Sequence, residues 1–96
     1  MEITFDPVKR DWTLIHRALD FAVDAEKVFS GDTVTMIDDR SDYGEIRRIS
    51  AGFLADRMVV IVWTERGASR HINSMRYCHA KEETRWRKIL RQGADR

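Results

Sequence analysis

The sequence predicts a single α+β domain over residues 1–96, in which a small antiparallel meander of four or five strands is covered by two N-terminal helices and one C-terminal helix. Three observations support this prediction. Helix patterns lie near the two ends of the chain, strand patterns fill the middle, and the turns between the later strands are short. A chain of 96 residues also has room for only one modest core.

The stretch Met58–Thr64 is expected to be the central strand. It is a short apolar run with three valines, which is typical of a strand that is buried on both faces. It is too short to cross a membrane. Because Glu65, Arg66 and Gly67 follow directly, the charged side chain of Arg66 is expected at the end of a rigid element, a suitable place for a reactive group.

A short strand over residues 3–5 and two helices are expected at the N-terminus. Asp6 is a natural N-cap for the first helix, and Pro7 suits the first helical position. The apolar stripe of this helix is expected to be buried, and it consists of Val8, Trp12, Ile15 and Leu19. Asp20 is expected to cap a second helix that ends at residues 30–32. The apolar side of this second helix consists of Phe21, Ala22, Ala25, Val28 and Phe29.

Three further strand patterns accompany the central one. Residues 33–37 have strand composition, residues 38–44 form a polar loop, and residues 45–53 return to a strand pattern. Alternation in 45–53 predicts one face made of Glu45, Arg47, Ile49, Ala51 and Phe53. The run 70–78 is expected to be the last strand. Regular alternation there predicts one face with Ile72, Ser74, Arg76 and Cys78, and the other with His71, Asn73, Met75 and Tyr77.

A last helix is expected from about Ala80 to Gln92, with Gly93 as its C-cap. Its buried stripe is predicted to be Trp86, Ile89 and Leu90. Each of the three tryptophans lies on an apolar stripe, so the core is expected to contain Trp12, Trp63 and Trp86.

Charge is distributed unevenly along the chain, although the net charge is only +1. Residues 1–65 hold 8 Lys/Arg and 13 Asp/Glu, which gives −5, whereas residues 66–96 hold 9 Lys/Arg and 3 Asp/Glu, which gives +6. A basic C-terminal third is the asymmetry expected if one face meets a polyanion. A solvated basic face on the last helix explains the same asymmetry without any partner.

Several classes of protein are disfavoured by the sequence. The acidic N-terminus lacks the apolar segment of a signal peptide, and the single cysteine, Cys78, cannot form an internal disulfide, so a reducing cytoplasm is expected. No Gly-rich phosphate loop, Cys-x-x-Cys or His-x-x-x-His motif occurs. We therefore expect no metal, no cofactor and no membrane contact.

Basic and aromatic residues remain as candidates for chemistry, namely Lys9, His16, Arg47, Arg66, Arg76, Tyr77 and His79. Such a set suits phosphodiester cleavage without a metal. When a 2′-hydroxyl attacks the neighbouring phosphate, negative charge builds up on the phosphoryl oxygens, and fixed guanidinium groups bind that charge well. An acid and a base are also needed for the leaving and attacking oxygens.

The order and spacing of several short elements from Phe5 to Trp86 resemble the BrnT-type toxins of bacterial type II toxin–antitoxin pairs, which are grouped with the RelE-like ribonucleases. The elements are Phe5-Asp6-Pro7-x-Lys9, Leu19-Asp20-Phe21 with Ala25 and Val28-Phe29, Glu45-x-Arg47 with Gly52, Val59-Val60-x-Val62 with Thr64-Glu65-Arg66, Ile72-x-Ser74-x-Arg76, Glu82 and Trp86. The chain departs from the family pattern at His16-Arg17-Ala18, where Lys-His-Gly is usual, at Thr13, where Asn is usual, and at Tyr77-Cys78-His79, which replaces a segment rich in Arg or Lys.

The resemblance implies a RelE-like fold and an endoribonuclease that cleaves mRNA and slows growth when free. It also implies a BrnA-like antitoxin with a ribbon-helix-helix DNA-binding part, and contact with promoter DNA only through the complex of the two proteins.

On this basis Arg66 and Arg76 are expected to stabilise the phosphate in the transition state, with Lys9 and His16 as secondary electrostatic or acid–base groups. The residues expected to bind RNA are Arg47, Arg70, Tyr77, His79, Lys81 and Arg85. Structural roles remain open for several of these residues. Arg76 is also placed to form an ion pair with Glu82, and Arg47 to form one with Glu45. Tyr77 is also placed to pack against other side chains. Two other functions stay open: a module that binds RNA or protein without cleaving, and a degenerate toxin retained as an antitoxin partner.

Overall fold

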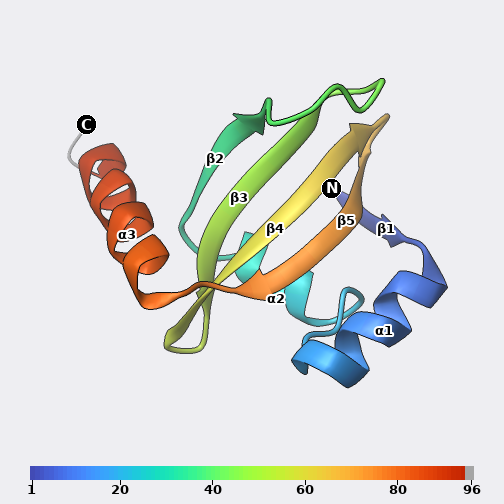
Figure 1. Ribbon diagram of the computed structural model, residues 1–96, viewed down its shortest axis with the longest axis horizontal. Helices are drawn as coiled ribbons and strands as arrows, with labels where there is room; N and C mark the ends of the chain where they lie inside the picture. Colours follow the sequence, from blue (N-terminus) through green and yellow to red (C-terminus); the bar gives the residue numbers. More distant parts are fainter. Residues whose placement is uncertain (95–96) are drawn as a thin grey trace.

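The computed structural model describes residues 1–94, which form one five-stranded sheet and three helices (Figure 1). The strands are β1 (Glu2–Phe5), β2 (Thr33–Asp38), β3 (Arg47–Leu54), β4 (Arg57–Arg66) and β5 (Ser69–Tyr77). The helices are α1 (Pro7–Arg17), α2 (Asp24–Phe29) and α3 (Ala80–Ala94). The predicted α+β class is confirmed, and so is the predicted order of elements.

The strand order in the sheet is β1-β5-β4-β3-β2. Strands β2 to β5 form the expected antiparallel meander, whose last turn places Gly67 at φ 58°, a conformation that glycine adopts at little cost. Strand β1 lies parallel to β5 at the opposite edge and pairs Thr4 with His71. The first five residues therefore meet the end of the sheet that carries the β4–β5 turn.

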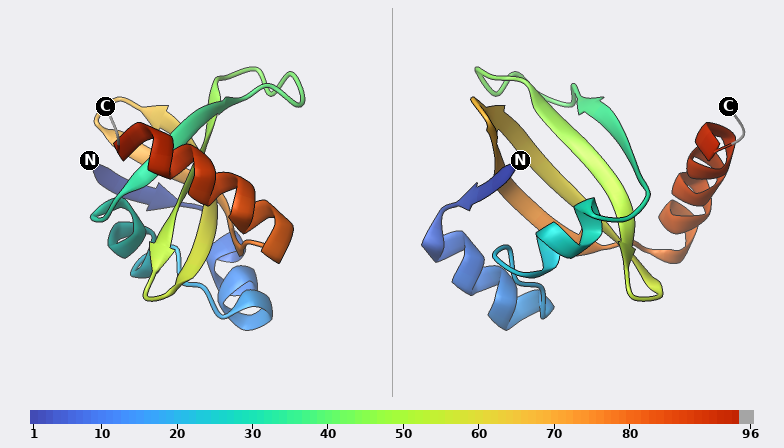
Figure 2. Two further views of the ribbon diagram at one scale, coloured as in Figure 1. Left: turned by 90° about the vertical axis from the view of Figure 1, so that its left-hand side faces the viewer. Right: turned by 180° about the vertical axis from the view of Figure 1, so that it is seen from behind.

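The two faces of the sheet are covered by different helices (Figure 2). On the α2 face lies the main core, with Leu19, Phe21, Ala25, Val28, Val59, Ile61, Trp63, Ile72 and Met75. On the α3 face a smaller cluster forms around Ala51, Met58 and Val60, against which Trp86 of α3 packs. Every residue from Met58 to Thr64 is buried, so the prediction of a central strand covered on both faces is confirmed.

Helix α1 begins as predicted, because the Asp6 carboxylate accepts a hydrogen bond from the Val8 N–H at 2.9 Å. The predicted buried stripe is wrong. Val8 and Ile15 are 75% and 78% exposed, Trp12 is 48% exposed, and within the helix only Thr13 is fully buried. Only Leu19, which follows the helix, enters the core.

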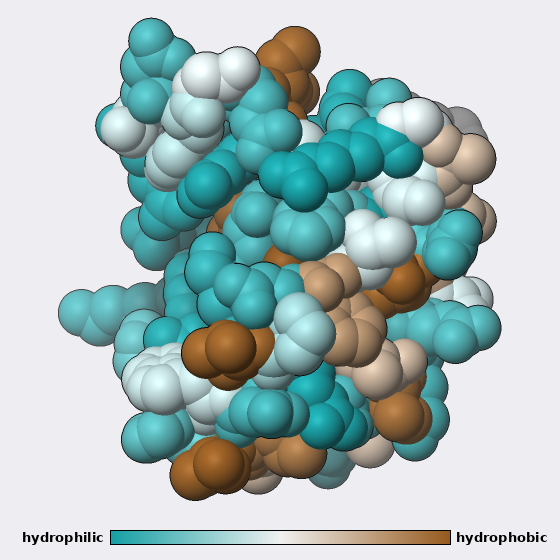
Figure 3. Space-filling view, turned by 90° about the vertical axis from the view of Figure 1, so that its right-hand side faces the viewer, coloured by the Kyte–Doolittle hydropathy of each residue, from teal (hydrophilic) through white to brown (hydrophobic). Residues whose placement is uncertain are grey.

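Polar contacts with the rest of the protein explain why α1 turns a different side toward the core than the one predicted. The Arg10 guanidinium binds the Asp20 carboxylate through two hydrogen bonds of 3.0 and 2.8 Å, and Arg17 Nη1 donates to the Met75 carbonyl at 2.9 Å. Arg10, Thr13 and Arg17 lie on one side of a helix, and that side faces the protein. The apolar stripe is thereby turned toward solvent, where Figure 3 shows brown apolar residues among polar ones on the α1 side of the molecule.

Two helix boundaries differ from the prediction. Helix α2 starts at Asp24 rather than directly after Asp20, although the Asp20 side chain does accept hydrogen bonds from the Ala22 N–H and the Arg10 guanidinium. Helix α3 continues through Gly93 to Ala94, so Gly93 is not a C-cap. Ile89, predicted to be buried, is 36% exposed, because the side of α3 facing the sheet instead contains Glu82, Trp86 and Leu90.

A β-bulge at Asn73 changes the predicted faces of β5. Trp63 pairs with Ile72 and Val62 with Ser74, so Asn73 is an extra residue in this strand. The bulge shifts the alternation, so that His71, Ser74 and Arg76 lie on the α3 face, whereas Ile72, Met75 and Tyr77 lie on the α2 face. The prediction that His71 shares a face with Met75 and Tyr77 is therefore wrong.

Strand β1 covers only part of the β5 edge. Its last residue, Phe5, pairs with Ile72, and helix α1 then lies along the rest of that edge, held by the bond from Arg17 to the Met75 carbonyl. An edge strand with free backbone groups tends to pair with other chains, and α1 shields this one.

Candidate functional site

The α3 face is apolar at one end and polar at the other. Helix α3 packs over the end formed by Ala51, Met58 and Val60. At the opposite end the face carries a set of polar side chains, which we call the polar cluster: Thr4, Glu45, Thr64, Arg66, His71 and Asn73. They come from β1, β4, β5 and the loop before β3, so the cluster exists only in the folded chain.

Hydrogen bonds connect the polar cluster. Asn73 Nδ2 donates to Thr64 Oγ1 at 3.0 Å, and Thr64 Oγ1 lies 3.5 Å from Glu45 Oε1. Arg66 Nη2 binds the same carboxylate oxygen at 3.2 Å. The Arg66 side chain is 51% exposed, so the guanidinium keeps donors facing solvent. The expected ion pair between Glu45 and Arg47 is replaced by this contact with Arg66.

His71 is a half-buried member of the polar cluster, and its Nδ1 lies 2.9 Å from Thr4 Oγ1. When Nδ1 donates to this hydroxyl, Nε2 is free to accept a proton. Burial lowers the pKa of His71, and the nearby Arg66 cation lowers it further. At neutral pH the ring is therefore mainly uncharged, as a general base must be.

Two of the basic residues predicted from the sequence lie next to the polar cluster. Lys9 is close enough for its positive charge to contribute to the lowered pKa of His71. Arg47 stands opposite Thr64 in the sheet, with its guanidinium 4.0 Å from the centroid of the Tyr43 ring. Arg66, Lys9 and Arg47 thus share one end of the α3 face.

Arg76 lies on the same face but at the other end. It stands opposite Val60, six positions before Arg66 on β4, which corresponds to roughly 20 Å along the strand. Its guanidinium forms two hydrogen bonds of 2.6 and 2.7 Å with Glu82 of α3. This is the bridge to Glu82 anticipated from the sequence, and it ties α3 to the sheet.

The bridge makes the docking of α3 dependent on pH. Arg76 lowers the pKa of Glu82 from 4.5 to about 2, so the stabilisation is fully present above pH 4.5 and is lost as the pH falls from 4.5 through 2. We expect Glu82→Gln to lower the free energy of unfolding at pH 7 by about 1 kcal/mol, a small value because Arg76 is partly screened by solvent. We also expect the variant to lose less stability than the native protein when the pH falls from 4.5 to 2. Thermal unfolding across this pH range measures both effects. Asp11→Asn, which breaks an exposed pair, is the control, and an unchanged acid profile in Glu82→Gln would contradict the assignment.

The other predicted site residues lie away from the polar cluster. His16 stacks on Trp12 on the exposed side of α1, and its Nδ1 is 2.8 Å from the Trp12 carbonyl oxygen. Arg70 and Tyr77 lie on the α2 face, where Arg70 covers Phe29 and Tyr77 packs beside the core. The remaining three are exposed near or on α3: His79, Lys81 and Arg85.

Sequence reasoning missed His71 and Thr4 as site residues. They are 67 residues apart in the chain and meet only because β1 pairs with β5 in parallel. The strand pattern of residues 70–78 contains no signal for the bulge that turns His71 toward Arg66. The proximity of Glu45 to Arg66 likewise depends on the loop before β3.

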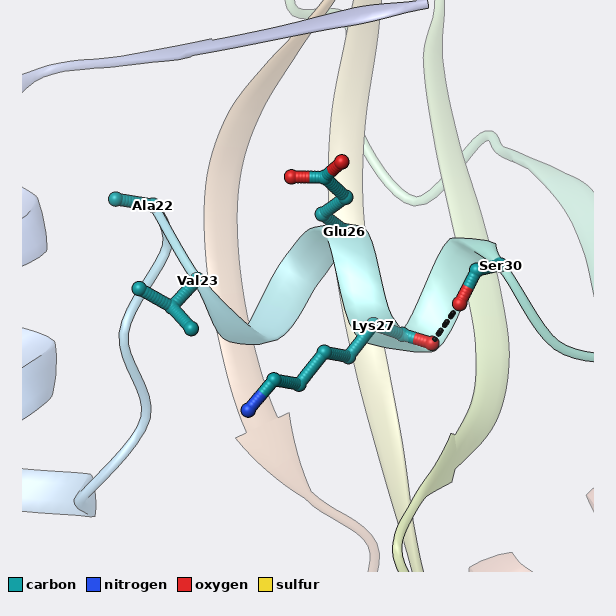
Figure 4. A pocket seen from close by; sticks show the side chains of 5 residues that line it. All are labelled: Ala22, Val23, Glu26, Lys27 and Ser30. Atoms are coloured by element: carbon teal, nitrogen blue, oxygen red, sulfur yellow. Dashed lines mark hydrogen bonds between the residues drawn. The ribbon is translucent and has the colours of Figure 1, made fainter.

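A separate hollow of about 440 Å³ lies beside α2 (Figure 4). Its lining comes from one short segment, Ala22, Val23, Glu26, Lys27 and Ser30, and the Ser30 hydroxyl donates to the Lys27 carbonyl. Because α2 packs on the opposite face from the polar cluster, this hollow is not continuous with it. Within residues 1–94, no three His, Cys, Asp or Glu side chains gather as metal ligands do, and no helix is long and apolar enough to span a membrane.

Comparison with known families identifies the family of the chain. Residues 5–82 match the model of the ribonuclease toxin BrnT of type II toxin–antitoxin systems. The chain belongs to the BrnT family. The matched segment contains all strands except the first three residues of β1, and it contains the whole polar cluster apart from Thr4. No curated protein matches the chain. Membership in the BrnT family implies that the substrate is RNA and that an antitoxin is the partner.

Proposed function

We propose that the protein is an endoribonuclease that cleaves RNA without a metal, by attack of a ribose 2′-hydroxyl on the adjacent phosphate at the polar cluster. The single observation that supports this most is the meeting of His71, with its lowered pKa, and Arg66 on an open part of the α3 face. A neutral imidazole and a fixed guanidinium are the two groups that such a reaction requires.

In the proposed mechanism His71 Nε2 takes the proton from the 2′-hydroxyl, while the hydrogen bond between Nδ1 and Thr4 fixes the ring. Arg66 donates to the non-bridging oxygens as their charge rises, and Lys9 adds positive charge nearby. Glu45 holds the Arg66 guanidinium in place from the opposite side. The 5′-oxygen leaves with a proton from solvent, and the products are a 2′,3′-cyclic phosphate and a 5′-hydroxyl.

This proposal revises the pairing of Arg66 with Arg76 expected from the sequence. The two guanidinium groups belong to opposite ends of one sheet face, and Arg76 is held by two bonds to Glu82. We therefore assign Arg66 to the phosphate and Arg76 to the attachment of α3. His16 has no role in the proposed reaction, since its ring packs on Trp12.

The family also supports a proposal about partners. We propose a BrnA-like antitoxin with a ribbon-helix-helix part, which brings the complex to promoter DNA, and a cytoplasmic location where mRNA is accessible. The relation to RelE-like ribonucleases stands as part of the same proposal, on the resemblance of the motifs.

Cleavage of a defined RNA in excess EDTA tests the reaction. We expect fragments that end in a 2′,3′-cyclic phosphate and begin with a 5′-hydroxyl, identified by mass spectrometry. An otherwise identical RNA with a single 2′-deoxyribose at the cleaved position is the control, because it lacks the attacking oxygen. Cleavage of the deoxy-substituted RNA, or activity that EDTA abolishes and a metal ion restores, would contradict the proposal.

A further inference from the structure

Another cavity, of about 210 Å³, lies between α1 and the part of the β5 edge that β1 leaves uncovered. It is lined by Lys9, Trp12, Thr13, Arg17, Asn73 and Ser74. From this lining and its position we propose that the cavity holds the base of a nucleotide next to the scissile phosphate. The inference rests on the proposed ribonuclease function and adds a subsite to it.

The cavity adjoins the polar cluster through Asn73, a member of the cluster, and through Lys9, which lies next to it. Asn73 lines the cavity and also donates from Nδ2 to Thr64 Oγ1, within the cluster. Lys9 lines the cavity and acts on the charge of His71. We therefore expect an RNA whose phosphate contacts Arg66 to reach this cavity with its neighbouring nucleotide.

The chemistry of the lining fits a nucleobase. Trp12 lines the cavity with its ring stacked on that of His16, the two centroids 4.4 Å apart, and the guanidinium carbon of Arg17 lies 5.1 Å from the Trp12 centroid. Single-stranded RNA is commonly bound by stacking its bases on aromatic rings and on arginine. The amide of Asn73 and the hydroxyls of Thr13 and Ser74 add donors and acceptors for the edge of a base.

The lining favours a nucleotide over a segment of a partner protein. Five of its six residues are polar or charged, and two of these are cationic. The strongly exposed apolar residues of α1, Val8 and Ile15, do not line the cavity. An apolar anchor of a protein partner would find its best surface at those two residues instead.

The test combines a protein variant with an altered RNA. In the native protein, an abasic residue beside the cleaved phosphate is expected to lower kcat/KM by about 5- to 150-fold, the usual value of one stacked base. In Trp12→Ala the same loss should already be present with normal RNA, and the abasic residue should add little to it. Trp12→Phe should restore much of the activity.

Ile15→Ala is the matched control, since Ile15 is an exposed apolar residue of the same helix that lies outside the cavity. We expect it to cleave like the native protein, and both variants to unfold near the native temperature. Additive losses from Trp12→Ala and the abasic residue would overturn the subsite. So would normal cleavage by Trp12→Ala combined with weakened antitoxin binding, which would assign the surface to the partner.

A binding measurement separates the subsite from the reaction. In the background of His71→Gln, fluorescence anisotropy with uncleaved RNA should still show weaker binding when Trp12 is replaced by alanine. If RNA binding depends on Trp12 but the native protein cleaves no RNA, the ribonuclease mechanism is refuted and the subsite stands. If the protein cleaves RNA at the polar cluster and Trp12→Ala changes neither binding nor cleavage, only the subsite is refuted.

Discussion

His71→Gln is expected to lower RNA cleavage by roughly 100- to 10,000-fold, the usual contribution of a general base. Glutamine retains a similar polar shape beside Thr4 but cannot take up the proton of the 2′-hydroxyl. Single-turnover cleavage of a labelled RNA at saturating protein measures the effect, because it reports the chemical step separately from binding.

His79→Gln is the matched control, since His79 is an exposed histidine just before α3 and outside the polar cluster, and a loss of RNA binding there does not change the single-turnover rate at saturating protein. It is expected to cleave at the native rate. Thermal unfolding of both variants should stay close to that of the native protein, because neither side chain is part of the apolar core. Native activity in His71→Gln, with the fold intact, would remove His71 from the mechanism.

Arg66→Gln is expected to lower cleavage by about 100- to 1,000-fold, the typical cost of losing one fixed donor to a developing oxyanion. It should also change the pH dependence. Burial and the Arg66 cation both lower the pKa of His71, so removing the cation lets that pKa rise toward 6.5. The acid side of the pH–rate profile should therefore move to higher pH in the variant.

Arg91→Gln removes the same charge from an exposed site on α3 and serves as the control. This control is expected to keep the native cleavage rate and the native pH–rate profile on its acid side. If Arg66→Gln loses activity but the acid side of its pH–rate profile does not shift, the titrating group is not His71. Full activity in Arg66→Gln would contradict its role at the phosphate.

Much of the fold was predictable because its signals are local. The run Met58–Trp63 is apolar without interruption, and the structure buries it on both faces. The alternation of residues 45–53 was also assigned to the correct faces, since β3 pairs with β4 without a bulge. Asp6 and Pro7 start α1 as predicted.

The orientation of α1 was not predictable from periodicity. Its apolar stripe gives a clear helical pattern, yet the helix is rotated by Arg10 and Arg17, whose partners Asp20 and Met75 lie elsewhere in the chain. A pattern of hydrophobic residues indicates a helix, but it does not show whether the apolar side meets the core or solvent.

The residues of the candidate site were predicted only in part, for a similar reason. Arg66 could be proposed because it ends an obvious strand, and Lys9 because of the family motif. His71 requires the parallel pairing of β1 and the bulge at Asn73, and both are long-range features. Arg76 fits the family motif equally well, but its partner Glu82 gives it a structural role.

The bulge in β5 has one more consequence. Ile72 and Ser74 lie on opposite faces, as adjacent residues of an ordinary strand do. A chain shortened by the single residue Asn73 would thus keep each remaining side chain of β5 on its present side and complete its ladder with β4. The ladder with β4 does not require this residue, whereas Thr64 and the cavity lining beside Trp12 would lose an amide.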